Sequence, residues 1–237
     1  MEKQDLLYEG KAKKVYATKD PNFIIMHYKD DTAAYNGIKR AQIKNKGRIN
    51  SAIAAILFER LHQEGIPTHF IRRINEEEHL CKKLDIIKLE VIVRNRVAGS
   101  MAKRLNLKEG TRLPNTVYEL CYKDDDLGDP LINDHHAVAL AIASYDDVKT
   151  INKMAEKINR VLTDFFDSAG IILINMKVEF GKTSDGKIVL ADEISPDSSR
   201  LWDKETMEIL DKDRFRRDLG RVAESYQEIL DRINKLC

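Results

Sequence analysis

Two acidic residues, Glu179 and Asp192, flank a stretch that is typical of a β-hairpin, and their chemistry suggests a metal site. Asp185-Gly186 is a strong signal for a two-residue turn, and this turn would place Glu179 opposite Asp192. Like charges directly opposite one another destabilise a sheet, so a cation between them is favoured. Mg²⁺ carried by a polyphosphate fits, because it takes oxygen ligands and often only one or two protein carboxylates. The alternative is that both carboxylates face water beside Lys177.

The segment that carries Glu179 is predicted to be a strand with one buried face, because apolar and polar residues alternate along it. The polar face is expected to carry Asn175, Lys177 and Glu179. The buried face is expected to carry the apolar residues Ile172, Ile174, Met176, Val178 and Phe180.

Near the N-terminus, Gly10 separates two predicted strands, and Lys11 and Lys13 share a face. Glycine lets the backbone approach a ligand closely, so these lysines are candidates for phosphate contacts. The stretch is not a P-loop, because the second glycine and the Lys-Ser/Thr pair are missing. A solvated basic edge that prevents aggregation is the other interpretation, and these residues alone favour it.

Two further stretches suit an anion. Arginines at Arg94 and Arg96 precede Gly99 and Ser100, which open a predicted short helix. Free N–H groups at a helix start bind anions, and arginine adds bidentate phosphate contacts. A serine-rich loop that ends at Arg200 has the same character. A surface arginine cluster is the alternative for the first stretch.

The remaining polar clusters give little indication of a functional site. The acidic segment at residues 123–129 is more typical of a solvated loop than of a metal site. His135 and His136 are adjacent on a predicted helix, point apart and chelate poorly, so a zinc site is excluded there. Three cysteines, Cys81, Cys121 and Cys237, show no metal-ligand spacing, which predicts reduced thiols in a cytoplasmic protein.

The periodicities predict an α+β fold. Residues 6–16 are expected to form two strands separated by the turn at Gly10, and further strands are expected at 23–28, 68–74 and 81–97. The expected helices are 49–63, 144–170 and 213–236. The basic stretch from Lys39 to Arg48 is expected to be a mobile loop. We expect an antiparallel β domain with one helix at residues 1–93, and an α+β domain with the metal hairpin and the substrate loops at residues 94–237.

The composition narrows the class of protein. The 237 residues are 43% hydrophobic, which is enough for a substantial core. A formal net charge of +1 argues against binding nucleic acid or membrane through bulk charge. The sequence shows neither a membrane-length apolar run nor a signal-peptide pattern at its start.

Five motifs together resemble those of the SAICAR synthetase family, in the order of that family and over nearly the whole chain. They are Gly-Lys-Ala-Lys at 10–13, Val-Arg-Asn-Arg-Val-Ala-Gly-Ser at 93–100, Gly-Asp-Pro at 128–130, Lys-Val-Glu-Phe-Gly at 177–181 and Asp-Glu-Ile-Ser-Pro-Asp-Ser-Ser-Arg-Leu-Trp-Asp at 192–203. The resemblance implies ligation of L-aspartate to the carboxylate of carboxyaminoimidazole ribonucleotide (CAIR), with ATP converted to ADP and phosphate. It also implies a kinase-like or ATP-grasp-like N-terminal domain packed on a larger α+β domain, with the nucleotide in the cleft between them.

The resemblance further implies a role for each matched residue. The implied ATP-binding residues are Lys11, Lys13, Lys83 and Glu90, and the implied Mg²⁺ carboxylates are Glu179 and Asp192. The implied binding residues for the ribonucleotide phosphate are Arg94, Ser100 and Arg200, and the implied catalytic residues are Lys177, Asp129 and Lys13. The substrate carboxylate would attack the γ-phosphate to form an acyl phosphate, and the amine of aspartate would displace the phosphate.

One position departs from the family, because many members have Asp where this chain has Asn175, so a role that needs a carboxylate there is in doubt. Lys46, Arg48 and Lys123 are candidates to bind aspartate, because they are cationic and lie in expected loops. A homodimer is expected. A small-metabolite kinase and a nucleotide-binding regulatory protein with the same cleft are the alternatives.

Overall fold

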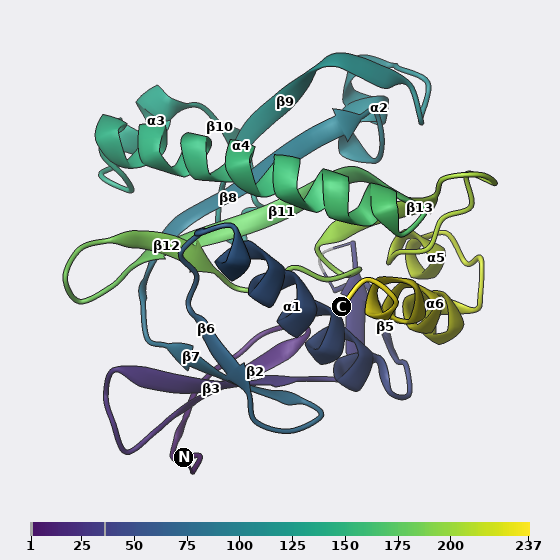
Figure 1. Cartoon of the computed structure of the whole chain (residues 1–237). Helices are drawn as coiled ribbons and strands as arrows, with labels where there is room; N and C mark the ends of the chain where they lie inside the picture. Colours follow the sequence, from purple (N-terminus) through teal and green to yellow (C-terminus); the bar gives the residue numbers. More distant parts are fainter. Residues whose placement is uncertain (1, 36) are drawn as a thin grey trace.

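The computed structural model describes residues 2–35 and 37–237, and a five-stranded antiparallel sheet forms its N-terminal part (Figure 1). The strand order is β1-β2-β3-β7-β6. The strands are β1 (Leu6–Glu9), β2 (Lys13–Ala17), β3 (Phe23–Tyr28), β6 (Phe70–Arg73) and β7 (Glu78–Lys82). A separate hairpin consists of β4 (Asp31–Ala34) and β5 (Lys39–Gln42).

The second sheet has six strands, and its central strand β11 pairs with β8, β12 and β13. The strand order is β10-β9-β8-β11-β12, with β13 paired to β11. The strands are β8 (Asp85–Arg96), β9 (Arg112–Tyr122), β10 (Leu131–Ile132), β11 (Ile171–Lys182), β12 (Ile188–Ala191) and β13 (Ser199–Asp203).

Long helices cover these sheets (Figure 1). The helices are α1 (Lys46–Gln63), α2 (Ser100–Leu105), α3 (Asp134–Ala139), α4 (Tyr145–Ser168), α5 (Asp213–Arg216) and α6 (Val222–Asn234). A capping box between Ser144 and Asp147 fixes the start of α4, as the sequence predicts. The buried face of α4 includes Ile151 and Phe166 and packs on β11, while α6 packs against α1.

The residues from 67 to 69 link the two sheets. The backbone N–H of His69 donates to the carbonyl of Leu190 at 2.8 Å, and the N–H of Leu190 donates to the carbonyl of Pro67 at 3.0 Å. One large apolar core therefore extends from α1 and β7 to α4 and β11. The expected domain boundary after residue 93 lies within β8, and the division into two domains stays a prediction.

The expected hairpin register is wrong by one residue. Glu179 pairs with Ala191 instead of Asp192, because three residues rather than two form the turn. Thr183 and Lys187 are joined by a backbone hydrogen bond of 2.9 Å, and Gly186 adopts a φ of 79° at the end of the turn. Asp192 follows β12 in the left-handed region, with a φ of 59°.

The strict alternation expected along β11 is also interrupted. A register shift between Leu173 and Asn175 reverses the faces before this point. Ile172 and Ile174 therefore pack with Ala98 and Trp202 in a small separate cluster, away from the main core. After the shift, Met176, Val178 and Phe180 lie in the main core, as predicted.

Two further expectations need correction. The stretch from Lys39 to Arg48 is not a loop throughout, because it contains β5 and the first turn of α1. The single helix expected at 213–236 is divided into α5 and α6. Asp218, Gly220 and Arg221 all have positive φ values between these helices, and this backbone conformation ends a right-handed helix. Leu219, which lies between the two helices, is 47% exposed.

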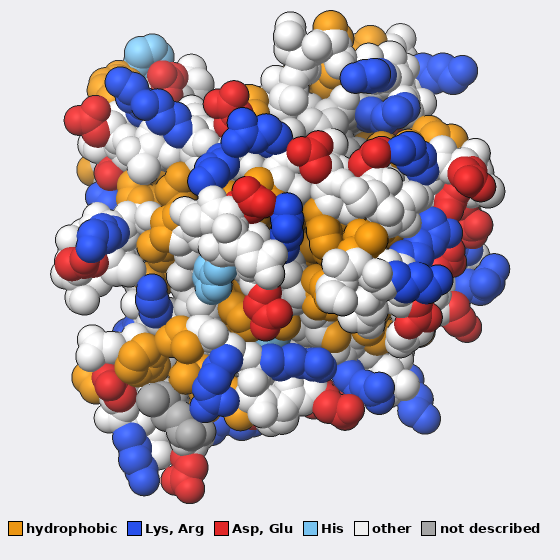
Figure 2. All heavy atoms as spheres, viewed as in Figure 1, with side chains coloured by type: hydrophobic (Ala, Val, Ile, Leu, Met, Phe, Trp, Pro, Cys, Tyr) orange, Lys and Arg blue, Asp and Glu red, His pale blue; other side chains and the backbone are white. Residues whose placement is uncertain are grey.

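The α+β class predicted from the sequence is confirmed. Figure 2 shows that positive and negative side chains intermix over the visible face, in agreement with the small net charge. Among the described helices, none has the length and apolar character needed to cross a bilayer.

Candidate active site

A cavity of about 410 Å³ is lined by residues of both sheets. Its apolar lining comes from the first sheet, from the link before β8 and from the start of β8, and includes Leu7, Val15, Ile24, Met26, Leu84 and Ile86. Its charged lining comes largely from the second sheet and the segments around it, and includes Glu90, Lys123, Lys177, Glu179, Asp192, Glu193 and Lys212. A flat apolar group and a highly charged group can therefore bind side by side.

Lys13 extends from β2 to the acidic pair that follows β12. Its ammonium contacts the carboxylate of Asp192 and lies 2.9 Å from that of Glu193. Burial lowers the pKa of Lys13, but Asp192 and Glu193 outweigh burial and raise the pKa overall. Burial likewise raises the pKa of Asp192, but Lys13 and Lys177 hold it far below its usual range. Both partners of this ion pair are therefore charged at neutral pH.

Lys177 lines the cavity and lies among three carboxylates. Its ammonium is 2.5 Å from Glu179, 2.8 Å from Glu90 and 3.8 Å from Asp192. Glu179 also accepts a hydrogen bond of 2.8 Å from Lys123. Glu90 and Glu179 are register partners on β8 and β11, so antiparallel pairing places these two acids together.

Glu179 and Asp192 fit a hard divalent cation. Both carboxylates lie within 4 Å of the ammonium of Lys177, so one cation already sits between them. Their donors are all oxygens, which Mg²⁺ prefers. Within residues 2–35 and 37–237, no group of three or more His, Cys, Asp or Glu side chains forms a preformed metal cage. A metal held here would need further ligands from water or phosphate.

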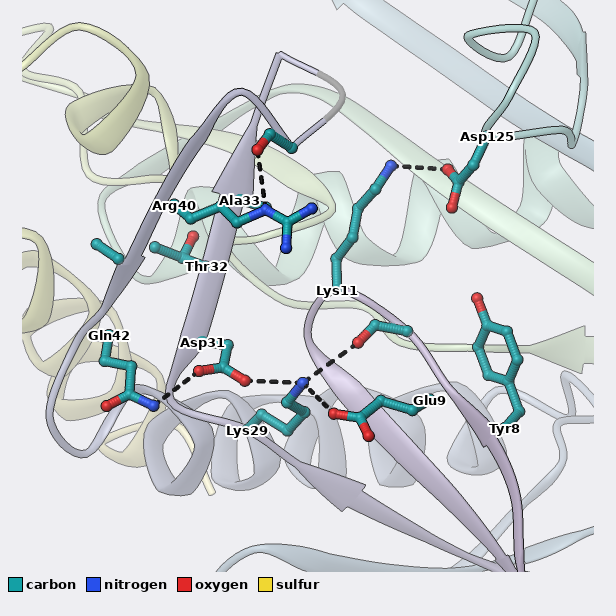
Figure 3. A pocket seen from close by; sticks show the side chains of 13 residues that line it. Tyr8, Glu9, Lys11, Lys29, Asp31, Thr32, Ala33, Arg40, Gln42 and Asp125 are labelled. Carbon is teal, nitrogen blue, oxygen red and sulfur yellow. Dashed lines mark hydrogen bonds and ion pairs between the residues drawn. The ribbon is translucent and has the colours of Figure 1, made fainter.

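The expected lysine beside the glycine turn lies at the entrance of the cavity. Lys11 contacts Asp125 at 2.7 Å, and a second hollow of about 690 Å³ opens beside this pair (Figure 3). Lys29 is neutralised there by Glu9 and Asp31, at 2.6 Å and 2.7 Å. The first and second hollows share Lys11 and Asp125 in their linings.

The remaining expected residues of this region are nearby. Asp129 and Lys83 both line the 410 Å³ cavity. Asp129 has a φ of 50° and accepts a hydrogen bond of 3.0 Å from the backbone of Asp124. The side chain of Asp129 therefore helps to order the acidic loop at residues 123–129.

The two expected phosphate arginines are brought together by strand register. Asn175 on β11 pairs with Arg94 on β8 and with Arg200 on β13, so the three residues stand side by side. Arg94 is only 1% exposed, and it donates hydrogen bonds of 2.8 Å to Glu119 and 3.0 Å to the hydroxyl of Ser100.

The carboxylate of Asp213 orients the second arginine, Arg200. Asp213 accepts two hydrogen bonds from Arg200, at 2.8 Å and 3.2 Å. Burial raises the pKa of Asp213, but Arg200 and Arg216 outweigh burial and lower it to about 2. Arg200 also donates to Oδ1 of Asn175 at 3.2 Å, while the buried Nδ2 of Asn175 has no partner in the described structure. Position 175 therefore offers a hydrogen-bond donor in place of the carboxylate that many family members have there.

Gly99 makes room for this arrangement. A Cβ atom at position 99 would lie 2.6 Å from a guanidinium nitrogen of Arg200. Gly99 also has a φ of 59° and a ψ of −128°, a conformation that side-chain-bearing residues rarely adopt. The glycine before α2 therefore brings Arg200 against the start of this helix.

Sequence reasoning missed three buried members of the site. Glu193 pairs with Lys13, and Asp197 pairs with Lys46 at 2.6 Å. Lys212 lines the cavity and is 9% exposed. The run at 192–203 was a signal for the first two, whereas nothing local distinguishes Lys212 from the other lysines.

The three candidates for aspartate binding do not lie together. Lys123 lines the cavity, and Lys46 is buried against Asp197. Arg48 lies outside the lining and forms a surface pair with Glu76 at 3.5 Å.

Known proteins match this chain over nearly its full length. A model of the SAICAR synthetase family matches residues 6–233. The chain belongs to the SAICAR synthetase family. A phosphoribosylaminoimidazole-succinocarboxamide synthase from Clostridium botulinum (strain Loch Maree / Type A3) is 57% identical over 235 residues, which cover 99% of this chain and 100% of the relative. The synthase of that name from Fusobacterium nucleatum is 54% identical, with 99% of both chains covered.

Solved SAICAR synthetases share the fold. A synthase from Ehrlichia chaffeensis superposes with a TM-score of 0.95 at 41% identity, covering 97% of this chain and 98% of the other. A type-2 SAICAR synthetase in complex with ADP superposes with a TM-score of 0.93 at 50% identity, covering 95% and 96%. The family resemblance of the five sequence motifs is therefore confirmed.

Proposed function

We propose that the 410 Å³ cavity is the active site at which this SAICAR synthetase joins L-aspartate to the carboxylate of CAIR, with ATP converted to ADP and phosphate. One observation carries the proposal. The polar face of β11 aligns Asn175 at the arginine site, Lys177 at the centre and Glu179 at the carboxylate pair. A ligand with a phosphate at one end and a carboxylate at the other matches this order.

The nucleotide would lie with its base against the apolar lining and its phosphates over Lys11 and Lys13. The ADP-bound relative supports a nucleotide in this family. Lys83 lies on the link that borders the apolar lining, and Glu90 holds Lys177 from the neighbouring strand. Glu179 and Asp192 would hold Mg²⁺, which when bound neutralises charge on the transferring phosphoryl group.

The residues of the chain then position the reacting groups. Arg94, Ser100 and Arg200 bind the remote phosphate of CAIR, and its binding energy holds the other end of the ribonucleotide in place. Lys177 orients the reacting carboxylate, and Asp129 lies close to it on the cavity wall. The carboxylate attacks the γ-phosphorus of ATP and ADP leaves, which gives an acyl phosphate. The amine of aspartate then attacks the acyl carbon, inorganic phosphate leaves, and the nitrogen loses a proton to give the amide. None of these side chains acts as a covalent nucleophile.

ADP release is the direct test, measured with ATP, Mg²⁺ and CAIR in the presence and absence of L-aspartate, with mass analysis of the product. We expect ADP together with a succinocarboxamide product only when aspartate is present. ADP release that does not depend on aspartate would point to a small-metabolite kinase. ATP binding without any turnover would point to a regulatory protein. Membership of the family favours neither alternative. A homodimer and a cytoplasmic location stay predictions.

A further inference from the structure

Lys212 lines the active-site cavity, and its ammonium has no ion-pair partner among the described residues. It stands directly before α5, lines the cavity and is 9% exposed. Its backbone is fixed, because its N–H donates to the carbonyl of Pro196 at 3.1 Å. In the described part of the chain, no carboxylate lies within the 4.0 Å ion-pair distance of its ammonium.

Two partly buried lysines of the cavity pair with carboxylates. Lys13 pairs with Asp192 and Glu193, and Lys177 pairs with Glu90 and Glu179. A buried charge costs free energy unless it is paired and hydrogen-bonded. Lys212 therefore differs from these neighbours, because no carboxylate in the described part of the chain forms an ion pair with it.

Asp197 is the carboxylate that attracts Lys212 most, but other side chains already donate hydrogen bonds to both of its oxygens. Lys46 donates to Oδ2 at 2.6 Å and Asn50 donates to the same oxygen at 3.0 Å. Tyr226 donates to Oδ1 at 2.8 Å. Lys46 is itself 1% exposed, so Asp197 and Lys46 form a closed buried ion pair. Asp197 therefore attracts Lys212 only from a distance and forms no ion pair with it.

The charges around Lys212 do not offset the effect of burial on its pKa. Burial lowers the pKa of Lys212, and the attraction of Asp197 is opposed by the cations of Arg216 and Lys46. Asp197 and Glu193 are the carboxylates that face it, and neither reaches its ammonium. A bound anion would supply the missing charge.

We propose that Lys212 binds a substrate carboxylate in the active site. The proposal rests on the proposed function and deepens it. Asp213, the next residue, holds Arg200 of the anion site, while Glu193 belongs to the carboxylate pair that contacts Lys13. Lys212 therefore lies between the two binding regions, near the place where the carboxylate of CAIR must meet the amine of aspartate. Two substrates can supply this group, namely the amino acid and the ribonucleotide.

The test is steady-state kinetics of Lys212→Met, with KM measured separately for L-aspartate, CAIR and ATP. We expect the KM of one carboxylate substrate to rise about 10- to 100-fold, because a charge-assisted hydrogen bond is lost, while the KM of ATP changes less than about twofold. A rise for aspartate assigns the amino acid as the source, and a rise for CAIR assigns the ribonucleotide. Lys204→Met is the matched control, because Lys204 is an exposed lysine paired with Asp167.

Stability gives an independent readout. Removal of a buried, unpaired charge should leave the Tm of Lys212→Met equal to or above that of the wild type. A purely structural lysine would instead lower the Tm. Lys212→Gln provides the kinetic measurement if the methionine variant does not fold, and Lys212→Arg should recover part of the affinity.

Several results would overturn the proposal. Unchanged KM values for all three substrates would do so, whether kcat falls or not. A lower Tm with unchanged KM values would identify a structural residue. If the wild type itself releases no ADP in response to aspartate, the proposed function fails instead, so the two failures are distinguishable.

Discussion

Substitution of Gly99 by alanine should weaken binding of the ribonucleotide through Arg200. The new Cβ would lie 2.6 Å from a guanidinium nitrogen of Arg200, so the arginine must move away from the start of α2. Loss of one hydrogen bond from a charged group costs about 1.5–3 kcal/mol, which corresponds to a rise in KM of about 10- to 100-fold for CAIR. Because the nucleotide is bound elsewhere, the KM of ATP should stay within about twofold.

Backbone strain must be separated from this effect. A non-glycine residue in the conformation of Gly99 costs about 1–3 kcal/mol of stability. Gly65→Ala is the matched control, because Gly65 also has a positive φ, at 69°, but has no atom within 4 Å of its Cβ position. Both variants should therefore lose thermal stability, while only Gly99→Ala should lose affinity for CAIR.

The assay is initial-rate kinetics of both variants with CAIR varied at saturating ATP and aspartate, alongside thermal unfolding. If Gly99→Ala retains the wild-type KM for CAIR while its Tm falls as in the control, the glycine serves only the backbone. Arg200 would then not be a phosphate-binding residue held in place by Gly99.

Three further predictions concern charges. Asp192→Asn should reduce turnover at least about 100-fold with an unchanged circular dichroism spectrum, because it removes a proposed metal ligand; near-normal rates would contradict that assignment. Lys46→Met should lower the free energy of unfolding by about 3–5 kcal/mol in denaturant titrations, since it leaves Asp197 buried without its cation, and Lys46→Met/Asp197→Asn should recover part of the loss. A hydrogen bond from the backbone of Thr206 lowers the pKa of Asp203 to about 2 from an ordinary 3.8, so the stability it contributes is present above pH 3.8 and lost as the pH falls through 2. The Tm difference between wild type and Asp203→Asn should therefore be large at pH 6 and vanish near pH 2.

The two longest helices, α1 and α4, could be predicted from local patterns, whereas the roles of the site residues stay predictions. The capping box at Ser144 and the apolar stripe after it specify α4 without reference to the rest of the chain. Gly99 and Ser100 similarly mark the start of α2. Family resemblance, rather than geometry, connected Arg94 with Arg200, because no local pattern relates residues so far apart.

The register of β11 could not be predicted, because small local differences decide it. A two-residue and a three-residue turn both accept Gly186 at a positive φ, yet they differ by one residue in pairing and place Asp192 differently. No distinctive residue type indicates the register shift between Leu173 and Asn175. Lys46 was expected in a loop, because its burial depends on Asp197, which lies 151 positions later.

The polar face of β11 acts as a molecular ruler. Asn175 and Glu179 lie on one strand and on one face, four residues apart, so the backbone fixes their separation at about 13 Å. Hydrogen bonds to three neighbouring strands prevent this spacing from adjusting to a ligand. The site should therefore select ligands by their length. A compound with the same reactive carboxylate but a shorter or absent phosphate arm can reach either the arginines or the acidic pair, but not both at once.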